Sequence, residues 1–422
     1  TPEALDALTV KIYDRTSGNP FFSHALLKLL GEYEFQLQTS SGQERTAAIL
    51  QGLPSDVVEI YSRRIATLDP ITQEVLSLAA CLGHRFPLHE LAMISNLRVA
   101  DCEQLLLHFA EDLIVPLSET PDAAAKRPHG KSFFRFAHDR VQQAAYARIA
   151  PSDLPGVRLT IARRLIAQLS PDQFSDRMCE IAAHFNAGME LVTDLAERLQ
   201  GVALNVAAAR KARSATAFRD ALQYHRAASR LLDTQEVQEQ LWRELHELGM
   251  ALCTEQAETE FLEGDPEKAA QCVRCAVANA QTPIEKAEAL ANLIIQYTLQ
   301  ANYAQAIATG REALAALGVT LPENEFDIAR DIEIAEIKRL VAGRSLDDLL
   351  ALPEATDATM RTVAKVLITM GPPCYRSHQQ LWSVVVPKVV QLTLRYGHIP
   401  QIGYSHTAFA GLLAWEIGRA HV

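Results

Sequence analysis

The sequence predicts a mainly α-helical protein: a short helical segment leads to a small unit built around a β-hairpin, and an array of paired helices follows. Three observations support this fold class. Apolar residues recur at helical spacing through most of the 422 residues. An aromatic, strand-like run, FFRF, stands between polar turn residues and a further helical pattern. In the second half, alanines recur one heptad apart in successive segments.

The composition is that of a globular protein with more than one domain. The chain has 48% hydrophobic and 6% aromatic residues, and 422 residues are too many for one compact unit. No apolar run reaches the roughly 20 residues that a membrane span requires. The net charge of -11 offers no general attraction to nucleic acid or anionic lipid, and seven scattered cysteines fit a reducing compartment. We therefore expect a cytoplasmic protein with no membrane span and no nucleic-acid partner.

Residues 1–69 have the pattern of helices separated by a sharp turn. Helical spacing over residues 2–16 is followed by TSGNPFF, which ends one helix and begins the next. Gly18 suits the left-handed cap of the first helix, Asn19 is held extended by the proline after it, and Pro20 suits the first turn of the second helix. The apolar residues that line this second helix are Phe21, Leu26, Leu27 and Leu30.

Residues 70–150 combine helical patterns with a β-hairpin. The elements expected are helices near 71–82, 88–95 and 101–111, a strand at 113–115, a long polar tip and a strand at 133–136. The stretch FAHDRVQQAAY then joins the last strand to a helix. Asp139 and Gln142 have the spacing of a capping box, so we expect Asp139 to cap this helix. His138 would stand at the helix N-terminus, where unpaired N–H groups suit a phosphate, or it would only pack and complete a hydrogen bond.

From residue 151 onward the pattern is helix pairs. We expect a helical linker and first pairs over residues 151–235 and repeats over 236–416, with turn signals at Leu321, Leu352 and Gly371. Small residues that would let paired helices approach closely recur as Ala221 and Ala228, Ala269 and Ala276, and Ala306 and Ala313. These are tetratricopeptide-like repeats, although they are longer than the roughly 34-residue unit and most signature Trp and Tyr positions are absent.

In this order, GNPFF, FAHDRVQQAAY and the later segments AAHFNAG and GRSLDDLLALPEATD resemble part of a STAND-type signal-transduction ATPase, a relative of AAA proteins. The sequence is most similar to such ATPase regions in bacterial multidomain serine/threonine kinases or sensor histidine kinases of two-component systems. The resemblance implies that residues 1–69 are the helical lid of an ATP-binding NTPase domain truncated at its N-terminus. It also implies that residues 70–150 are a winged-helix domain. The middle helices of residues 70–150 lack the basic residues with which a winged helix contacts DNA. We therefore favour a role in packing against protein for this domain.

The resemblance also implies nucleotide contacts. The turn Gly18, Asn19 and Pro20 would approach the adenine of ATP or ADP. By analogy with related switch ATPases, His138 would sense the phosphates of ADP. Magnesium would enter only through an upstream P-loop domain, so no cofactor is expected for this segment alone. We assign neither catalytic residues nor metal ligands.

Two motifs that could carry chemistry are incomplete. A P-loop has the form GxxxxGK[ST], but the GKS that ends at Ser132 has Ala125 at the position of the first glycine and no hydrophobic strand before it. We interpret it as the wing loop and expect no ATP hydrolysis by this segment alone. Cys272 and Cys275 form a CxxC inside a helical stretch without a second pair at zinc spacing. We interpret them as two small helix residues.

The expected function is that of a regulatory region that couples the ATP/ADP state and partner binding on the helical repeats to a signalling kinase. Whether the protein is an enzyme stays open at this point, because the segment has no catalytic centre; the full-length protein is expected to be a protein kinase with an ATPase module. The partners would be the upstream nucleotide-binding domain, the kinase domains of the same polypeptide, and a protein or inducer on the repeats. Two alternatives remain: an ATPase-linked transcription regulator or adenylyl cyclase region, and a non-catalytic interaction scaffold.

Both ends of the sequence indicate a fragment. Thr1 begins directly in a helical pattern without an initiator methionine or a signal peptide. The last six residues, 417–422, resemble the translation of a sequencing adapter and break an apolar helix without a cap. We exclude them from the fold prediction.

Overall fold

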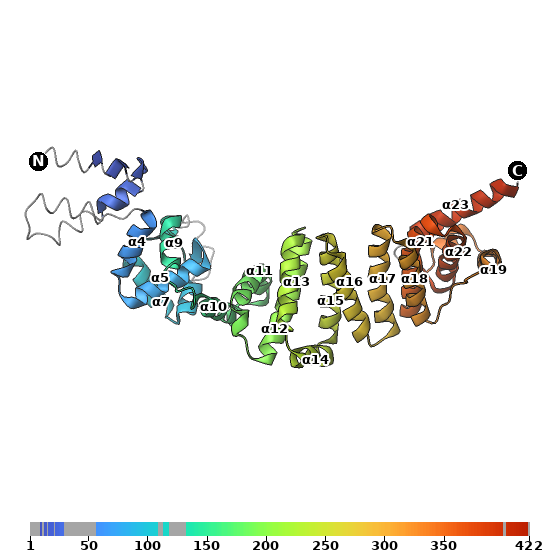
Figure 1. Ribbon diagram of the computed structural model, residues 1–422, viewed down its shortest axis with the longest axis horizontal. Helices are drawn as coiled ribbons and strands as arrows, with labels where there is room; N and C mark the ends of the chain where they lie inside the picture. The colour runs from blue at the N-terminus through green and yellow to red at the C-terminus, as the bar shows by residue number, and fades with distance from the viewer. Residues whose placement is uncertain are drawn as a thin grey trace, which may run out of the picture. The chain divides into compact units, whose positions relative to one another are not determined.

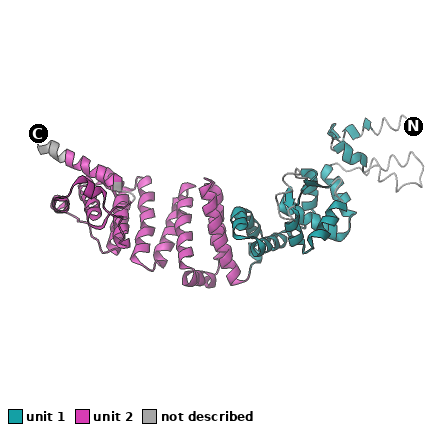
Figure 2. Cartoon of the chain, turned by 180° about the vertical axis from the view of Figure 1, so that it is seen from behind, with its two compact units in different colours: residues 1–192 teal, residues 193–422 magenta. Residues whose placement is uncertain are grey.

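Helices dominate the architecture. The computed structural model describes residues 9–10, 12–14, 16–20, 22–28, 56–108, 113–117, 132–399 and 402–420. It divides the chain into two compact units, unit 1 (residues 1–192) and unit 2 (residues 193–422), which are coloured separately in Figure 2. The strands among the described residues form one three-stranded sheet in unit 1, and the other elements are helices. The mainly α fold class predicted from the sequence is confirmed; the finer boundaries at residues 69, 150 and 235 stay predictions.

Unit 1 surrounds its small sheet with helices. Its labelled elements are α4 (Val57–Ala66), α5 (Pro70–Leu82), β1 (Arg85–Pro87), α6 (Leu88–Ser95), α7 (Val99–His108), β2 (Ile114–Leu117), β3 (Phe133–Phe136), α9 (Asp139–Tyr146), α10 (Leu154–Gln168), α11 (Pro171–Ala187) and the 3₁₀ turn η1 (Met189–Leu191). The expected hairpin is present as β2 and β3. A strand that the sequence analysis missed, β1, joins it, giving the antiparallel order β1-β3-β2.

Three phenylalanines form the centre of the unit 1 core. Phe86, Phe134 and Phe136 are all at most 1% exposed. The ring of Phe86 lies 6.5 Å from that of Phe134 and 5.7 Å from that of Phe136, centroid to centroid. Phe86 stands opposite Phe134 in the strand register. Because alternate side chains of a strand point to the same face, Phe134 and Phe136 of β3 both lie on the face that the helices cover.

Side-chain caps explain where several helices of unit 1 begin. The carboxylate of Asp56 accepts from the backbone N–H of Val58 at 3.0 Å at the start of α4. Asp69 does the same for Thr72, also at 3.0 Å, ahead of Pro70 in the first turn of α5. Both residues have extended backbones, as a cap requires.

Arginines join α10 and α11 to α6. Arg177 of α11 lies 2.5 Å from the Glu90 carboxylate, which is only 8% exposed, and also pairs with Glu180. Arg164 of α10 donates to the carbonyl oxygen of Ile94 at 2.8 Å, near the C-terminus of α6. A cation at the C-terminus of a helix, as Arg164 is here, complements both the unpaired carbonyls and the negative end of the helix dipole.

The histidine of AAHFNAG makes unit 1 sensitive to acid. Burial of His184, with the positive charge of Arg158 as the second cause, lowers its pKa to about 4. The unfolded chain takes up a proton near pH 6.5, whereas the folded chain does not do so until about pH 4. The free energy of unfolding of unit 1 should therefore fall by about 2–3 kcal/mol between pH 7 and pH 4.

Hydrogen exchange of unit 1 peptides in a urea titration measures this loss at each pH. His184→Gln should remove most of the pH-dependent part, because it deletes the titrating group. The same pH dependence in both proteins would contradict the assignment to His184.

Unit 2 is an array of helices; in Figure 1, α12, α13 and α15 to α18 stand side by side, and α14 lies across the ends of its neighbours. Its elements are α12 (Leu195–Ser214), α13 (Phe218–Leu231), α14 (Gln235–Glu244), α15 (His246–Leu262), α16 (Pro266–Asn279), α17 (Pro283–Leu299), α18 (Tyr303–Ala316), α19 (Phe326–Val341), α20 (Leu346–Leu350), α21 (Ala358–Ser377), α22 (Gln379–Tyr396) and α23 (Ile402–Ala420). Successive helices pack together from α14 to α18, whereas α13 packs against α12 and α15. Helix α18 then contacts α21, and α22 packs against α21, α19 and α23. None of the helices in the described part of the chain combines the length and apolar character that crossing a bilayer requires.

The recurring alanines lie where helices meet. All six predicted small positions are 0% exposed: Ala221, Ala228, Ala269, Ala276, Ala306 and Ala313. Two glycines mark equally close approaches that the sequence analysis missed. A Cβ on Gly310 of α18 would fall 2.4 Å from the Met370 sulfur of α21, and one on Gly249 of α15 would fall 2.7 Å from the Trp242 ring.

A polar network joins α13 to α15. The Glu260 carboxylate is fully buried and receives two hydrogen bonds from the Arg226 guanidinium, at 2.9 and 2.6 Å. The ring of His225, also fully buried, lies 3.0 Å from the Thr259 hydroxyl through Nδ1. These contacts satisfy polar groups that would otherwise destabilise the helix interface.

One predicted turn is wrong. The signal at Gly371 lies inside α21, which includes Pro372 and Pro373. Proline removes a helical hydrogen bond, but burial of this helix against α18 and α22 compensates.

Candidate functional site

The GNP turn begins the first candidate site. Ser17 and Gly18 have φ of 48° and 73°, so the chain leaves the first helix through two left-handed residues, as predicted for Gly18. A Cβ on Gly18 would fall 3.2 Å from the Tyr13 ring. The side chain of Asn19 accepts from the backbone N–H of Phe22 at 3.2 Å, and Pro20 is the first residue of the following helix. Asn19 thus caps the following helix, a role that the sequence analysis did not assign to it.

The helix after this turn faces the core through Leu26, which is fully buried, and Phe22, which is 8% exposed. Leu27, predicted to line the helix, is 52% exposed instead. Its neighbour Leu26 occupies the inward direction, and adjacent helical residues point about 100° apart. The other two predicted positions, Phe21 and Leu30, lie outside the described residues.

His138 caps α9, and the prediction that Asp139 does so is wrong. His138 has an extended backbone (φ -154°, ψ 154°) that continues β3, and its Nδ1 accepts from the backbone N–H of Arg140 at 3.1 Å. Asp139 is the first residue of the helix. Its carboxylate lies 3.1 Å from His84 Nδ1 and is largely exposed. Gln142 donates to the carbonyl oxygen of Ala80 at 3.1 Å, which fixes α9 against α5.

The cap determines what the His138 ring can do. Because Nδ1 accepts a backbone hydrogen bond, the ring proton of the neutral form resides on Nε2. The ring is half-buried at a helix N-terminus, the end that carries partial positive charge. An Nε2–H donor there is chemically suited to an oxyanion such as a phosphate.

The structure connects the two motifs through one core. Phe22 and Leu26, which follow the GNP turn, belong to the same hydrophobic cluster as Val141 and Ala144 of α9. The first two residues of the GKS motif lie outside the described residues; Ser132 is described, and its carbonyl oxygen accepts from the N–H of Leu88 at 2.9 Å. Among the described residues, no group of three or more His, Cys, Asp and Glu side chains is placed to hold a metal ion.

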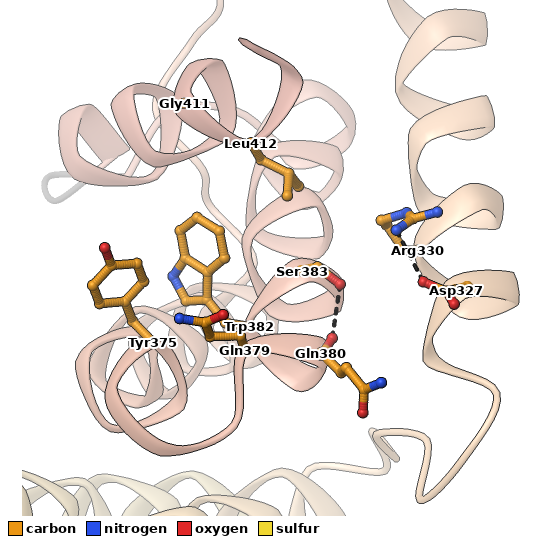
Figure 3. A pocket seen from close by; sticks show the side chains of 9 residues that line it. All are labelled: Asp327, Arg330, Tyr375, Gln379, Gln380, Trp382, Ser383, Gly411 and Leu412. Atoms are coloured by element: carbon orange, nitrogen blue, oxygen red, sulfur yellow. Dashed lines mark hydrogen bonds and ion pairs between the residues drawn. The ribbon is translucent and has the colours of Figure 1, made fainter. Parts of the chain in front are cut away.

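Unit 2 contains a second candidate site, a cavity of about 550 Å³ shown in Figure 3. Four helices contribute to it: α19, α21, α22 and α23. Its lining residues are Asp327, Arg330, Tyr375, Gln379, Gln380, Trp382, Ser383, Gly411 and Leu412. Sequence reasoning missed this cavity because its residues are spread over 86 positions and share no motif.

The cavity has an aromatic side and a charged side. The rings of Tyr375 and Trp382 meet edge to face at 5.3 Å. Across the cavity in Figure 3, the Arg330 guanidinium lies 3.0 Å from the Asp327 carboxylate. The indole N–H of Trp382 is buried without a hydrogen-bond partner among the residues that the structure describes. A buried donor of this kind favours an acceptor from a ligand or a water.

Two known proteins to which this chain is similar have names that refer to signal transduction. No family model matches the chain. The sequence is 24% identical over 477 aligned residues to hybrid signal transduction histidine kinase G of Dictyostelium discoideum; the alignment covers 97% of this chain and 14% of the kinase. The structure is similar, at a TM-score of 0.37 and 14% identity, to a signal transduction ATPase with numerous domains (STAND) and a tetratricopeptide repeat sensor from Pyrococcus horikoshii. That similarity covers 99% of this chain and 52% of the other. The relative found by sequence is a histidine kinase, and histidine kinases are one of the two kinds of kinase named in the motif resemblance.

Proposed function

We propose that this chain is a regulatory region of a nucleotide-switched signalling protein, and that it passes the nucleotide state and partner binding to a kinase elsewhere in the polypeptide. The observation that carries the proposal is the alignment with a signal transduction histidine kinase over 97% of this chain. The chain spans only 14% of that protein, so the kinase itself would lie outside it.

In the proposed mechanism, unit 1 responds to the nucleotide. His138 would donate from Nε2 to a phosphate oxygen of ADP, and the turn formed by Gly18, Asn19 and Pro20 would lie near the adenine. Each motif starts a helix whose buried side chains belong to the same core. Loss of either nucleotide contact would therefore alter the packing of both helices. Exchange of ADP for ATP would release His138. A differential contact of a few kcal/mol suffices to shift a two-state equilibrium.

Unit 2 would bind the protein partner. Helical arrays bind partners through extended surfaces. Within such a surface, the cavity beside Trp382 would take a partner side chain that is mostly apolar and carries one hydrogen-bond acceptor for the indole N–H. The charged pair of Arg330 and Asp327 on its other side would orient the partner.

Replacing His138 in the intact signalling protein tests the nucleotide role. His138→Ala should weaken ADP binding by about 10- to 150-fold, the effect of one lost hydrogen bond to a charged group. It should also raise basal kinase output, because the ADP-bound resting state loses a contact. Isothermal titration with ADP and an autophosphorylation assay without inducer measure the two effects.

His138→Asn is the matched control. Asparagine at this position keeps a side-chain acceptor for the Arg140 N–H but removes the Nε2–H donor. Both variants should therefore weaken ADP binding and raise output. If Asn behaves as the natural protein does and only Ala is defective, His138 is a structural cap and the proposed sensor role is wrong.

A further inference from the structure

Two cysteines lie at matching levels of the helix pair α15 and α16. Cys253 and Cys275 stand eleven residues before and eleven residues after Gly264, in the turn that joins the two helices. In two helices that pack side by side and run in opposite directions, such positions lie at the same level. The two thiols are close enough that each is a cause of the other's pKa shift.

The surroundings allow the helices to approach closely. Ala257, Ala269 and Ala276 of these two helices are all 0% exposed, and such small side chains allow helix backbones to come close. Cys253 belongs to the same hydrophobic cluster as Ala257 and Ala276. A disulfide requires Cα atoms closer than about 7 Å, and small neighbours favour that separation.

The two sulfurs differ in access. Cys253 is 9% exposed, whereas Cys275 is exposed. Cys275 borders an open cavity of about 580 Å³ that Trp242 and Arg243 of α14 also line. A small reagent can therefore reach Cys275 but not Cys253.

The pKa values of the two thiols also favour reaction at Cys275 over Cys253. The neighbouring Cys253 thiol, assisted by Asn279 against the opposing effect of burial, lowers the pKa of Cys275 to about 7. The Cys275 sulfur, followed by burial, raises the pKa of Cys253. Cys272, the CxxC neighbour, has its pKa raised to about 11, chiefly by burial. An exposed thiolate beside a second, buried thiol is the arrangement of redox-responsive cysteines.

We propose that Cys275 is a site of thiol modification by small-molecule disulfides and that Cys253 resolves the product into a disulfide between α15 and α16. The Cys275 thiolate attacks one sulfur of the small disulfide, whose S–S bond breaks. A mixed disulfide forms on Cys275, and one small thiolate leaves. Cys253 then loses its proton and attacks the Cys275 sulfur, which releases the second small thiolate.

The electrons and protons balance in these two steps. Two protein thiols are oxidised to one disulfide, and one small disulfide is reduced to two thiols. The leaving groups take up the two protons that Cys275 and Cys253 lose. The new bond would join α15 to α16 covalently and fix one helix pair of the array.

Oxidised glutathione, applied to the full 422-residue chain, is the probe. Unreacted thiols are alkylated after increasing times, and peptides are identified by mass spectrometry. We expect a linked peptide pair that contains Cys253 and Cys275, while Cys272 and Cys102 remain alkylated. In a parallel reaction with iodoacetamide at pH 7, Cys275 should react about tenfold or more faster than Cys272.

Single variants separate the two roles. Cys275→Ser should abolish both the mixed disulfide and the cross-link, Cys253→Ser should stop at one glutathione on Cys275, and the control Cys272→Ser should behave as the natural chain does. The iodoacetamide rates need no substitution and therefore test the site even where a variant misfolds. A Cys272–Cys275 bond, equal iodoacetamide rates for Cys272 and Cys275, or a linked pair that survives in Cys253→Ser would overturn the proposal.

Discussion

Replacing Phe136 with alanine is expected to lower the free energy of unfolding of unit 1 by about 3–5 kcal/mol, because it leaves a large cavity in a closely packed core. The ring is fully buried and meets that of Phe86 at 5.7 Å. Phe136 also stands two residues before His138, so the same change should loosen the start of α9. Hydrogen exchange of α9 amides measures both consequences.

Phe133 is the matched control for this prediction. It lies on the same strand but is only partly buried, with the Arg85 guanidinium 4.7 Å from its ring centroid. Phe133→Ala should cost at most about 1–2 kcal/mol, since it loses partial burial and one exposed cation–π contact. Equal losses for the two variants would show that the sheet, and not the aromatic centre, limits the stability of unit 1.

Arg226→Met is expected to destabilise unit 2 by about 2–4 kcal/mol, because it leaves the buried Glu260 carboxylate without its strongest partner. The guanidinium is half exposed, whereas the carboxylate is 1% exposed. The loss of stability therefore arises mainly from the Glu260 carboxylate, which remains buried without its counter-charge. Thermal unfolding followed by circular dichroism, together with exchange of α13 and α15 amides, measures this loss.

The double variant Arg226→Met, Glu260→Met decides between this explanation and simple loss of packing. It removes both charges and should recover most of the stability. Arg219→Met is the surface control: Arg219 is 84% exposed and 3.7 Å from Glu263, so its loss should change stability by less than about 0.5 kcal/mol. A double variant as unstable as Arg226→Met would contradict the buried-charge argument.

Features set by neighbouring residues were predicted well. The helix pairs, the hairpin and the left-handed Gly18 follow from patterns that extend over a few residues, and the structure confirms them. The recurring alanines were also predicted, because a helix pair imposes one spacing on every unit. In each case the local preference and the tertiary packing favour the same result.

The cap of α9 shows where local reasoning fails. His138 and Asp139 both carry an acceptor within reach of the first free amides, so spacing alone cannot separate them. The backbone of β3 decides: it continues extended through His138, and the helix starts one residue later. The Trp382 cavity and the Cys253–Cys275 contact could not be predicted for a related reason. Each depends on which helices pack together, and no short stretch of sequence encodes that.

The alanine contacts of unit 2 have a consequence for how such a chain can change over generations. Because most of its helices contact the next ones along the chain, a duplicated or deleted helix pair would meet the same small side chains on either side. The array could thus gain or lose whole helix pairs with little loss of stability. A single residue inserted inside a helix would instead rotate its alanine away from the neighbouring helix. Gene variants of this region should differ by pairs far more often than by single residues within helices.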